Sequence, residues 1–533
     1  MMKKITLLIT FFTILGVNAQ WNTDTAVNTL VSTSNSNDSK SIGTSDGQTY
    51  VVFWKSVAAP TNYELRVQLL DASGNQQFGA DGALISNTIP MSTYTAFWSV
   101  SIDSNDNLYV GVIGTDNETG LAYKIDTNGT VLWTVTNPSA QLVKVLPMSS
   151  GDAVVAWLST STYKATMQKY DSDGNSVWSS NQTTADAGTA PANLYELSTG
   201  GYIMVFHQLA SGINSTLYAQ RFDVDGNAVW GSRIQLSNKT TAYNTNYDGT
   251  QDGDVIYYGY TGKSATRFDS YLQRINADGT LPWGINGVDF DTNTTNYEME
   301  TEIAFSSGSD YIWSVCTYRN QTQNDSGEYV QKFDKATGTR QFTDNAKQVY
   351  AIGSDNVHAG ALQLVNDQPL FLIKSGADNG ATPTTLNVCY LDANGDFVWA
   401  EETKPVATYS ANKSRISFCM PVNGQVVTVF IENKGAGDTI YAQNFTDSTL
   451  SINDFNAAIS LQYVNPIQNE LRFNSERKIQ RVTVTNNLGQ VLLKMDANSN
   501  NVVLSTRSWN SGVYYIDITF NSGSLKGLKI LKE

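Results

Sequence analysis

Histidine side chains are scarce in this sequence, and their spacing limits the chemistry that they can perform. The chain has 533 residues and only two histidines, His207 and His358. Metal centres and nucleophile–base pairs need such groups close together. Two histidines about 150 residues apart therefore argue against a histidine-based site. His207 ends the apolar run GYIMVFH, so we expect it to be a core residue with its polar atoms satisfied.

The three cysteines are Cys316, Cys389 and Cys419, and each stands in an apolar or strand-like run. An odd count does not make a disulfide framework. Free cysteine is among the most buried residue types, so the sequence predicts buried structural thiols. One disulfide between two of the three is the alternative.

Acidic residues gather in short turns such as DSDGN at 171–175 and DVDGN at 223–227. A calcium loop of the EF-hand type needs carboxylates at positions 1, 3 and 5 and glycine at position 6. Here glycine comes fourth, and Asp/Asn-Gly between strands indicates a hairpin turn. We therefore expect Asp171 and its equivalents to accept backbone N–H bonds.

The familiar catalytic signatures are missing from the sequence: no GxSxG, HExxH, P-loop or GxGxxG occurs in a strand–helix context. Carboxylate pairs for glycoside hydrolysis are compatible with the composition, but nothing singles out one pair. The sequence thus identifies no catalytic, cofactor-binding or metal-ligating residue and no required cofactor.

The acidic turns belong to a repeat that organises most of the chain. An apolar run ends in Asp, a Gly turn follows, and an aromatic residue stands four positions after the Gly, as in MQKYDSDGNSVW at 167–178. The mean spacing of the repeat is about 53 residues. The turn glycines are Gly74, Gly129, Gly174, Gly226, Gly279, Gly338 and Gly395.

Each repeat reads as four strands, because a second apolar run precedes every turn motif and recurs eight times. Four-stranded units at this period are typical of β-propeller blades. The eighth unit lacks the Gly turn and the final strand. Residues 26–32, AVNTLVS, resemble that strand, so we expect the N-terminus to complete the last blade and close the ring. About eight blades are predicted, with seven as the alternative.

One aromatic side chain recurs at the same position of most repeats. A residue that recurs in every blade is expected to pack between neighbouring sheets rather than to stack on a sugar. The recurrent tryptophans are Trp133, Trp178, Trp230, Trp283 and Trp399.

The D-x-x-G-x-x-x-W pattern resembles the tryptophan-docking repeat of pyrroloquinoline-quinone-type propellers, which have eight blades. That resemblance implies blade packing, not function. Quinone enzymes of the family use calcium and adjacent cysteines, whereas this chain has no vicinal cysteine pair and no CxxCH. The quinone cofactor is therefore not expected.

Residues 1–19 have the features of a signal peptide: Lys3 and Lys4, a short apolar run, and Val17-Asn18-Ala19 before the cleavage point. Beyond it the body is acidic, with a net charge of −15 for the whole chain. Such a charge repels phosphate backbones, which argues against a nucleic-acid partner.

After the propeller repeats at 20–445 and a polar linker at 446–460, residues 461–533 alternate as short strands and predict a small Ig-like β-sandwich. The segment resembles the type A C-terminal sorting domain of the Bacteroidetes type IX secretion system. Matching features are Asn465-Pro466, VTVTNNLGQVLL, SWNSGVYYIDI and a Lys-rich last strand. The family's Tyr-Pro-Asn-Pro reads Tyr-Val-Asn-Pro here.

This resemblance implies contact with the type IX secretion machinery, removal of the domain, and release or attachment at the outer-membrane surface. For the propeller, two functions stay open. One is a secreted or cell-surface protein that binds a glycan, a polymer or a protein. The other is a polysaccharide hydrolase or lyase with carboxylates in the central channel.

Overall fold

The computed structural model describes residues 21–533 except 59–62, 88–97, 114–118, 244, 246, 265–266, 307, 378–379, 381, 423, 451–460, 487–489 and 521–524. The predicted signal peptide and most of the predicted linker lie outside the described residues. So does the hairpin turn that the sequence Asn-Leu-Gly predicts at 487–489. Residues 446–450, the start of that linker, continue the last propeller strand and form a short 3-10 helix, η2 (Ser448–Leu450).

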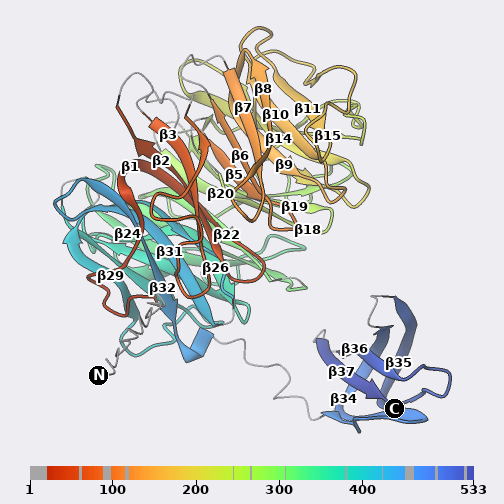
Figure 1. Cartoon of the computed structure of the whole chain (residues 1–533). Coiled ribbons are helices and arrows are strands. Elements are labelled where there is room, and N and C mark those ends of the chain that lie inside the picture. Colours follow the sequence, from red (N-terminus) through yellow and green to blue (C-terminus); the bar gives the residue numbers. More distant parts are fainter. Residues whose placement is uncertain are drawn as a thin grey trace, which may run out of the picture.

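Eight antiparallel blades of four main strands succeed one another along the chain, which confirms the predicted propeller and its blade number. Blades 8 and 1 share β1 and so form one seven-stranded sheet, and blade 4 has a short fifth strand. Figure 1 shows their arrangement. The second strand of each blade is buried on both faces, which explains its continuous apolar run. Blades 1 to 4 consist of β1 (Thr29–Gly43), β2 (Thr49–Ser56), β3 (Tyr63–Leu70) and β4 (Ala83–Ser86); β5 (Ser99–Ile102), β6 (Leu108–Ile113), β7 (Thr119–Ile125) and β8 (Val131–Pro138); β9 (Ala140–Pro147), β10 (Ala153–Ser159), β11 (Ala165–Tyr170) and β12 (Gln182–Thr183); and β13 (Thr189–Glu196), β14 (Tyr202–Leu209), β15 (Asn214–Phe222), β16 (Ile234–Gln235) and β17 (Thr241–Ala242).

The second half of the ring follows the same order. Blades 5 to 8 consist of β18 (Gly249–Asp252), β19 (Val255–Ser264), β20 (Arg267–Asn276) and β21 (Val288–Asp289); β22 (Tyr297–Ala304), β23 (Tyr311–Arg319), β24 (Ser326–Asp334) and β25 (Lys347–Tyr350); β26 (Asn356–Val365), β27 (Gln368–Ser375), β28 (Thr384–Tyr390) and β29 (Thr403–Ala411); and β30 (Lys413–Phe418), β31 (Gln425–Asn433) and β32 (Asp438–Thr446), with β1 as the fourth strand.

Strand β1 closes the ring by serving two blades. Its first half pairs with β32, with Thr29 opposite Ala442 and Leu30 opposite Tyr441. Its second half, up to Gly43, pairs with β2. The N-terminal segment therefore completes blade 8 before it becomes the innermost strand of blade 1. This confirms the predicted closure, which covers the edge that β32 would otherwise expose.

The repeated aromatic residues lie between blades, as predicted. Each packs on the turn glycine of the next blade, so closely that a Cβ added to Gly226 would come within 2.9 Å of the Trp178 ring. Trp399 has no such glycine to cover, and it packs on Phe445 instead. The aromatic–glycine pairs are Trp21–Gly74, Phe78–Gly129, Trp133–Gly174, Trp178–Gly226, Trp230–Gly279, Trp283–Gly338 and Phe342–Gly395.

The acidic turns have the hydrogen bonding that the hairpin interpretation predicts. Asp171 Oδ1 accepts the N–H groups of Asp173 at 3.0 Å and Asn175 at 2.8 Å. These bonds, with the Asn175 N–H contributing most, lower the pKa of Asp171. The carboxylate thus faces hydrogen-bond donors, which do not suit a bound cation.

The C-terminal domain is a single antiparallel sheet of five strands that bends around its own core. Register shifts in the long strand β34 accompany this bend. Leu471, Phe473, Val482 and Ile516 are among its buried residues. The strands are β33 (Leu461–Gln462), β34 (Glu470–Asn486), β35 (Val491–Ser505), β36 (Gly512–Phe520) and β37 (Leu525–Lys532).

Cys316, Cys389 and Cys419 are free and buried, so the prediction of structural thiols is confirmed and the alternative disulfide is not formed. Within the described ranges, no helix has the length and apolar character needed to cross a membrane.

Candidate functional site

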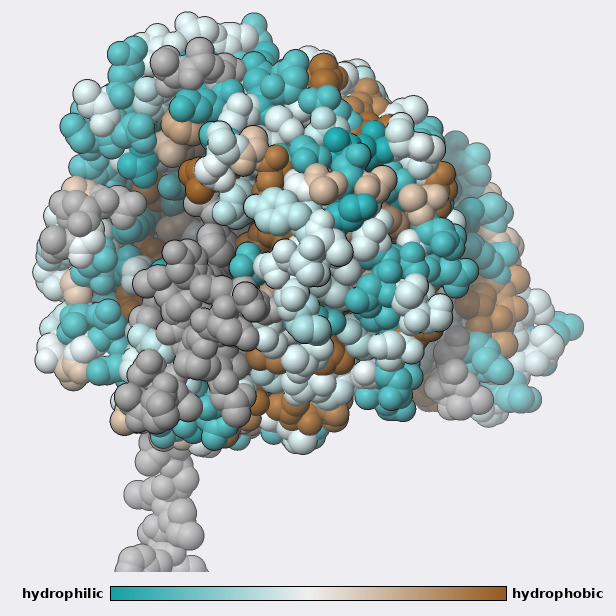
Figure 2. Space-filling view, turned by 90° about the horizontal axis from the view of Figure 1, so that it is seen from above, coloured by the Kyte–Doolittle hydropathy of each residue, from teal (hydrophilic) through white to brown (hydrophobic). Residues whose placement is uncertain are grey.

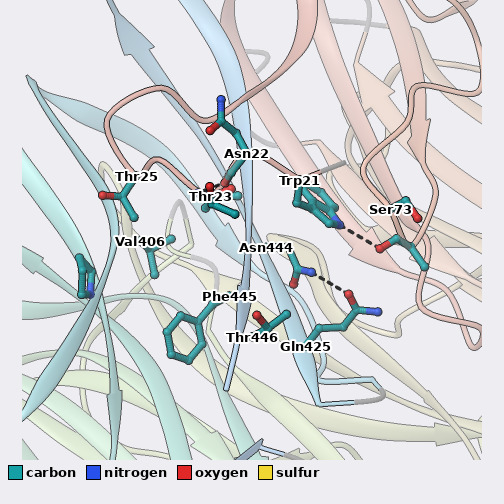
Figure 3. A pocket seen from close by; sticks show the side chains of 13 residues that line it. Trp21, Asn22, Thr23, Thr25, Ser73, Val406, Gln425, Asn444, Phe445 and Thr446 are labelled. Atoms are coloured by element: carbon teal, nitrogen blue, oxygen red, sulfur yellow. Dashed lines mark hydrogen bonds between the residues drawn. The ribbon is translucent and has the colours of Figure 1, made fainter. Parts of the chain in front are cut away.

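Three cavities formed by the described residues of the propeller are large enough to hold a ligand. The first, of about 520 Å³, lies at the seam where the ring closes (Figure 3). Trp21 and Asn22 of the N-terminal segment meet Asn444 and Phe445 of β32 there. Trp21 Nε1 donates to the Ala72 carbonyl at 2.9 Å. Its lining is thus engaged in closing the ring, which makes the seam a structural feature.

The second cavity, of about 420 Å³, lies between blades 4, 5 and 6, and one member of a carboxyl pair lines it. Glu302 of β22 lines it and is hydrogen-bonded to Asp248, whose Oδ2 also accepts the Ile303 N–H at 2.8 Å. Loss of hydration is the main cause that raises the pKa of Glu302, and the neighbouring Asp248 carboxylate raises it further. Loss of hydration also raises the pKa of Asp248. Both changes favour the protonated form of a carboxyl group in this pair.

The third cavity, of about 570 Å³, is in the central channel. It is lined by the innermost strands of five blades: β1, β5, β9, β13 and β30. Small hydroxyl side chains cover much of its wall. They are Ser39, Ser41, Ser99, Ser101 and Ser417.

Three cationic side chains enter this channel cavity from different blades, and one carboxylate lines it with them. Lys40 comes from β1, Lys144 from β9 and Arg415 from β30, whereas Asp38 is the acidic residue of the lining. The cavity therefore carries an excess of positive charge in a chain whose net charge is −15. This local reversal of sign makes the channel the strongest candidate for a binding site.

The two lysines repel one another in partly dehydrated surroundings. Loss of hydration, and then the charge of Lys40, lower the pKa of Lys144 to about 8. Loss of hydration also lowers the pKa of Lys40, although Asp38 opposes this change. An anion in the cavity would relieve both effects, because it favours the charged form of each amine.

Buried contacts between blades fix the single carboxylate. Asp38 Oδ2 accepts the indole N–H of Trp98 at 2.9 Å, and its Oδ1 lies 3.5 Å from Arg415 Nε. The Arg415 side chain lines the cavity and stays 51% exposed, so its pairing with Asp38 leaves it accessible to a ligand. Arg415 also has a positive φ of 51°, which places it at the register shift of β30.

The two histidines lie in separate blades, 4 and 7, as the sequence indicates. His207 is buried on β14 and its Nδ1 lies 2.9 Å from Ser215 Oγ. Burial lowers its pKa to about 3, so it stays neutral. His358 of β26 lies 2.9 Å from Glu328 of β24 and lines none of the three cavities. Neither histidine belongs to the candidate site.

Sequence reasoning did not identify Lys40, Lys144 or Arg415, because no motif surrounds them. A signal does exist: they are basic residues on the first strands of blades, where Lys40 and Arg415 have serine neighbours and Lys144 interrupts an apolar run. Only the ring brings these three strands, from blades 1, 3 and 8, to one cavity.

Residues 462–533 match the family of secretion system C-terminal sorting domains. This match agrees with the five-stranded domain that follows the propeller. The protein is thus an exported β-propeller with a sorting domain for the type IX secretion machinery, and its destination is the cell surface or the medium. No curated protein matches the chain.

Solved structures similar to this chain are distant. The Dos1 propeller is 12% identical with a TM-score of 0.42, over 78% of this chain and 94% of that one. Drosophila Semaphorin 2a is 9% identical with a TM-score of 0.38, over 82% and 96%. Puromycin hydrolase is 12% identical with a TM-score of 0.38, over 78% of this chain and 61% of that enzyme. At these scores none carries an argument about ligand or activity.

Proposed function

We propose that the mature chain is a secreted or surface-attached protein that binds an anionic glycan, bearing carboxylate or sulfate groups, in its central channel. The observation that supports this most is the convergence of Lys40, Lys144 and Arg415 on one cavity. Ammonium and guanidinium groups make charge-assisted hydrogen bonds to carboxylates and sulfates.

The rest of the lining suits a sugar. Ser41, Ser101 and Asn193 provide hydroxyl and amide groups around the cations. A cavity of about 570 Å³ is within the range of small-ligand sites. The outer face seen in Figure 2 is mostly hydrophilic, with apolar residues in scattered groups. That face supports a hydrated ligand better than a broad apolar partner.

Calorimetric titration with uronate, sulfated and neutral oligosaccharides tests this function. We expect binding of one or both anionic classes and none of the neutral sugars. Lys144→Met and Lys40→Met should each weaken binding about tenfold, as expected for one lost charged hydrogen bond. Lys164→Met, just before β11 of the blade that carries Lys144, is the matched control and should bind like the wild type.

The pH dependence follows from Lys144. An anion binds the protonated amine, so affinity should be greatest below the pKa of about 8 and should fall as the pH rises through it. Tight binding of a neutral glycan, or anion binding that Lys144→Met leaves unchanged, contradicts the proposal.

The alternative, a polysaccharide hydrolase or lyase with carboxylates in the central channel, finds no pair there, because Asp38 is the one carboxylate among the described residues that line the channel cavity. The remaining candidate is the Asp248–Glu302 pair beside the second cavity. Its geometry argues against the two-carboxylate mechanism of glycoside hydrolysis, which needs carboxyl groups about 5 Å apart or more. These two are hydrogen-bonded to one another and leave no room for the scissile bond. Binding is therefore the better supported function.

The proposed route of export combines both ends of the chain. A signal peptide at 1–19 would direct transport across the inner membrane, and the sorting domain at 461–533 would direct the next step across a Bacteroidetes-type outer membrane. We infer that removal of this domain leaves residues 20–445 as the functional propeller, either released or attached at the surface.

A further inference from the structure

A second site lies between blades 5 and 6, where three carboxylates meet. Asp289 ends β21, Asp291 follows it in the connection between the blades, and Glu298 is the second residue of β22. Each side chain offers an oxygen, and these oxygens lie within 4.8 Å of one another. Asp291 is 1% exposed and Glu298 is completely buried.

The neighbouring cations are engaged elsewhere. Arg267 forms an ion pair with Asp269. Arg340 donates to the backbone carbonyls of Asp289, at 2.8 Å, and Asp291, at 3.0 Å, rather than to a carboxylate of the cluster. Among the residues that the structure describes, no ion pair reaches the side chains of Asp289, Asp291 or Glu298.

Two oxygens of the cluster are buried and accept no hydrogen bond: Glu298 Oε1 and Asp289 Oδ1. The other Glu298 oxygen, Oε2, accepts the Ser270 N–H at 3.1 Å. The carboxyl group of Glu298 also faces that of Asp291. Carboxylates in such contact need a positive charge between them, which is either a proton or a metal ion.

We propose that Asp289, Asp291 and Glu298 bind a divalent cation, Ca²⁺, that joins blade 5 to blade 6. Oxygens up to 4.8 Å apart can share an ion with Ca–O distances of about 2.4 Å, which is the usual range for calcium. The ligand set holds only carboxylates and no histidine or cysteine, so it favours Ca²⁺ over transition metals. Export takes the chain to surroundings where calcium sites of millimolar affinity are used.

Neighbouring groups hold the carboxylates in place. Tyr318 of β23 donates its hydroxyl to Asp291 Oδ2 at 2.5 Å, and the Asn293 N–H binds Asp291 Oδ1 at 2.7 Å. Such contacts orient ligands around a metal. No sequence motif marks this cluster, because the DFD segment at 289–291 lies outside the recurrent acidic turns and Glu298 is seven residues further on.

The test uses the purified mature chain after treatment with EDTA. Titration with CaCl₂ in a calorimeter should show one site per chain, and saturating Ca²⁺ should raise the Tm by a few degrees. Glu298→Gln keeps the size of the side chain and should weaken Ca²⁺ binding at least tenfold. Glu302→Gln removes another buried carboxyl of the same strand, outside the cluster, and should keep the wild-type response.

A second measurement does not depend on a variant. Wild-type crystals soaked in Tb³⁺, which substitutes for Ca²⁺, should show an anomalous peak between Asp289, Asp291 and Glu298. A wild type without Ca²⁺ binding, or soaked crystals without this peak, overturns the proposal. So does a Glu298→Gln variant that binds Ca²⁺ like the wild type. If Ca²⁺ leaves the Tm unchanged and Glu298→Gln raises the Tm, then a proton, and not a metal ion, neutralises the cluster, and the proposal is overturned.

Discussion

The turn glycines of the repeat are in close contact with the aromatic rings that cover them. Each turn glycine of the series has a positive φ, such as 79° at Gly226, which a side chain adopts only with strain. The covering ring lies so near that no Cβ fits without a shift. Glycine is thus required here for two reasons, backbone conformation and space.

The substitution Gly226→Ala separates these two reasons. A Cβ at this position would lie 2.6 Å from Gln182 Cγ and 2.9 Å from the Trp178 ring. Gly151 has a φ of 90° but no atom within 4 Å of its Cβ position, so Gly151→Ala carries the backbone cost alone. We expect a loss of about 1 kcal/mol for Gly151→Ala and about 3 kcal/mol for Gly226→Ala in denaturant unfolding. Equal losses would show that the ring contact does not set the cost.

The buried His358–Glu328 pair makes stability depend on pH. Burial lowers the pKa of His358, but the charges of Glu328 and then Glu300 outweigh burial, and the pKa ends above 6.5. Because the folded pKa is the higher one, the stabilisation is complete below 6.5 and is lost as the pH rises through the folded pKa.

We therefore expect His358→Gln to destabilise the chain by about 3 kcal/mol at about pH 6 and by clearly less at about pH 9. Unfolding of both proteins in denaturant at the two pH values measures this difference. His207→Gln is the control with the opposite sign: the pKa of this histidine is lower in the folded chain than in the unfolded one, so its loss should be slightly smaller at about pH 6 than at about pH 9. A His358→Gln loss that is the same at both values would contradict the paired, charged histidine.

The turns were predictable because Asp171 and Gly174 form them within a few residues of the sequence. The packing aromatics were predictable because Trp178 and its equivalents contact the same position of the next repeat. The channel cations were not predictable. Lys40 and Arg415 are 375 positions apart in the sequence, and only closure of the ring brings their strands together.

At the scale of elements, the spacing of the turn motifs and the recurring apolar runs predicted the four-strand repeat. The resemblance of residues 26–32 to a final strand predicted that the N-terminal segment closes the ring. Strand β1 begins three residues later than the segment that resembled it, since the chain first forms a turn at residues 25–27. Several contacts hold the segment: Gln443 Nε2 donates to the Asn22 carbonyl at 2.8 Å, and Lys434 Nζ to that of Val27 at 2.6 Å.

Removal of residues 21–35 should open the ring. The loss of the fourth strand of blade 8 exposes the edge of β32, and the loss of Trp21 uncovers Gly74. We expect a lower Tm and self-association by light scattering, because an unpaired edge strand recruits other chains. Deletion of 462–533 is the control and should leave the propeller transition in place. A truncated chain that is monomeric and unfolds at the wild-type Tm would show that closure by β1 adds no stability.

At the scale of the molecule, the chain combines an export signal with a rigid ring that has a positively charged centre. The acidic exterior repels free anions, so affinity for an anionic glycan depends on the channel itself and should weaken as salt increases. The proposed Ca²⁺ site at the junction of blades 5 and 6 is separate from the channel, so its test does not depend on whether the channel binds a glycan.

Lys144 offers the most direct test of the central claim that the channel binds the ligand. With a pKa of about 8, roughly half of its amine is uncharged at that pH, so it should react with an acylating reagent much faster than ordinary lysines. Mass spectrometry of the modified chain, with and without the anionic glycan, measures this reaction. The account predicts rapid labelling of Lys144 that the glycan suppresses, while Lys164 is labelled equally in both samples. A glycan that binds at saturation and leaves the labelling of Lys144 unchanged would contradict it.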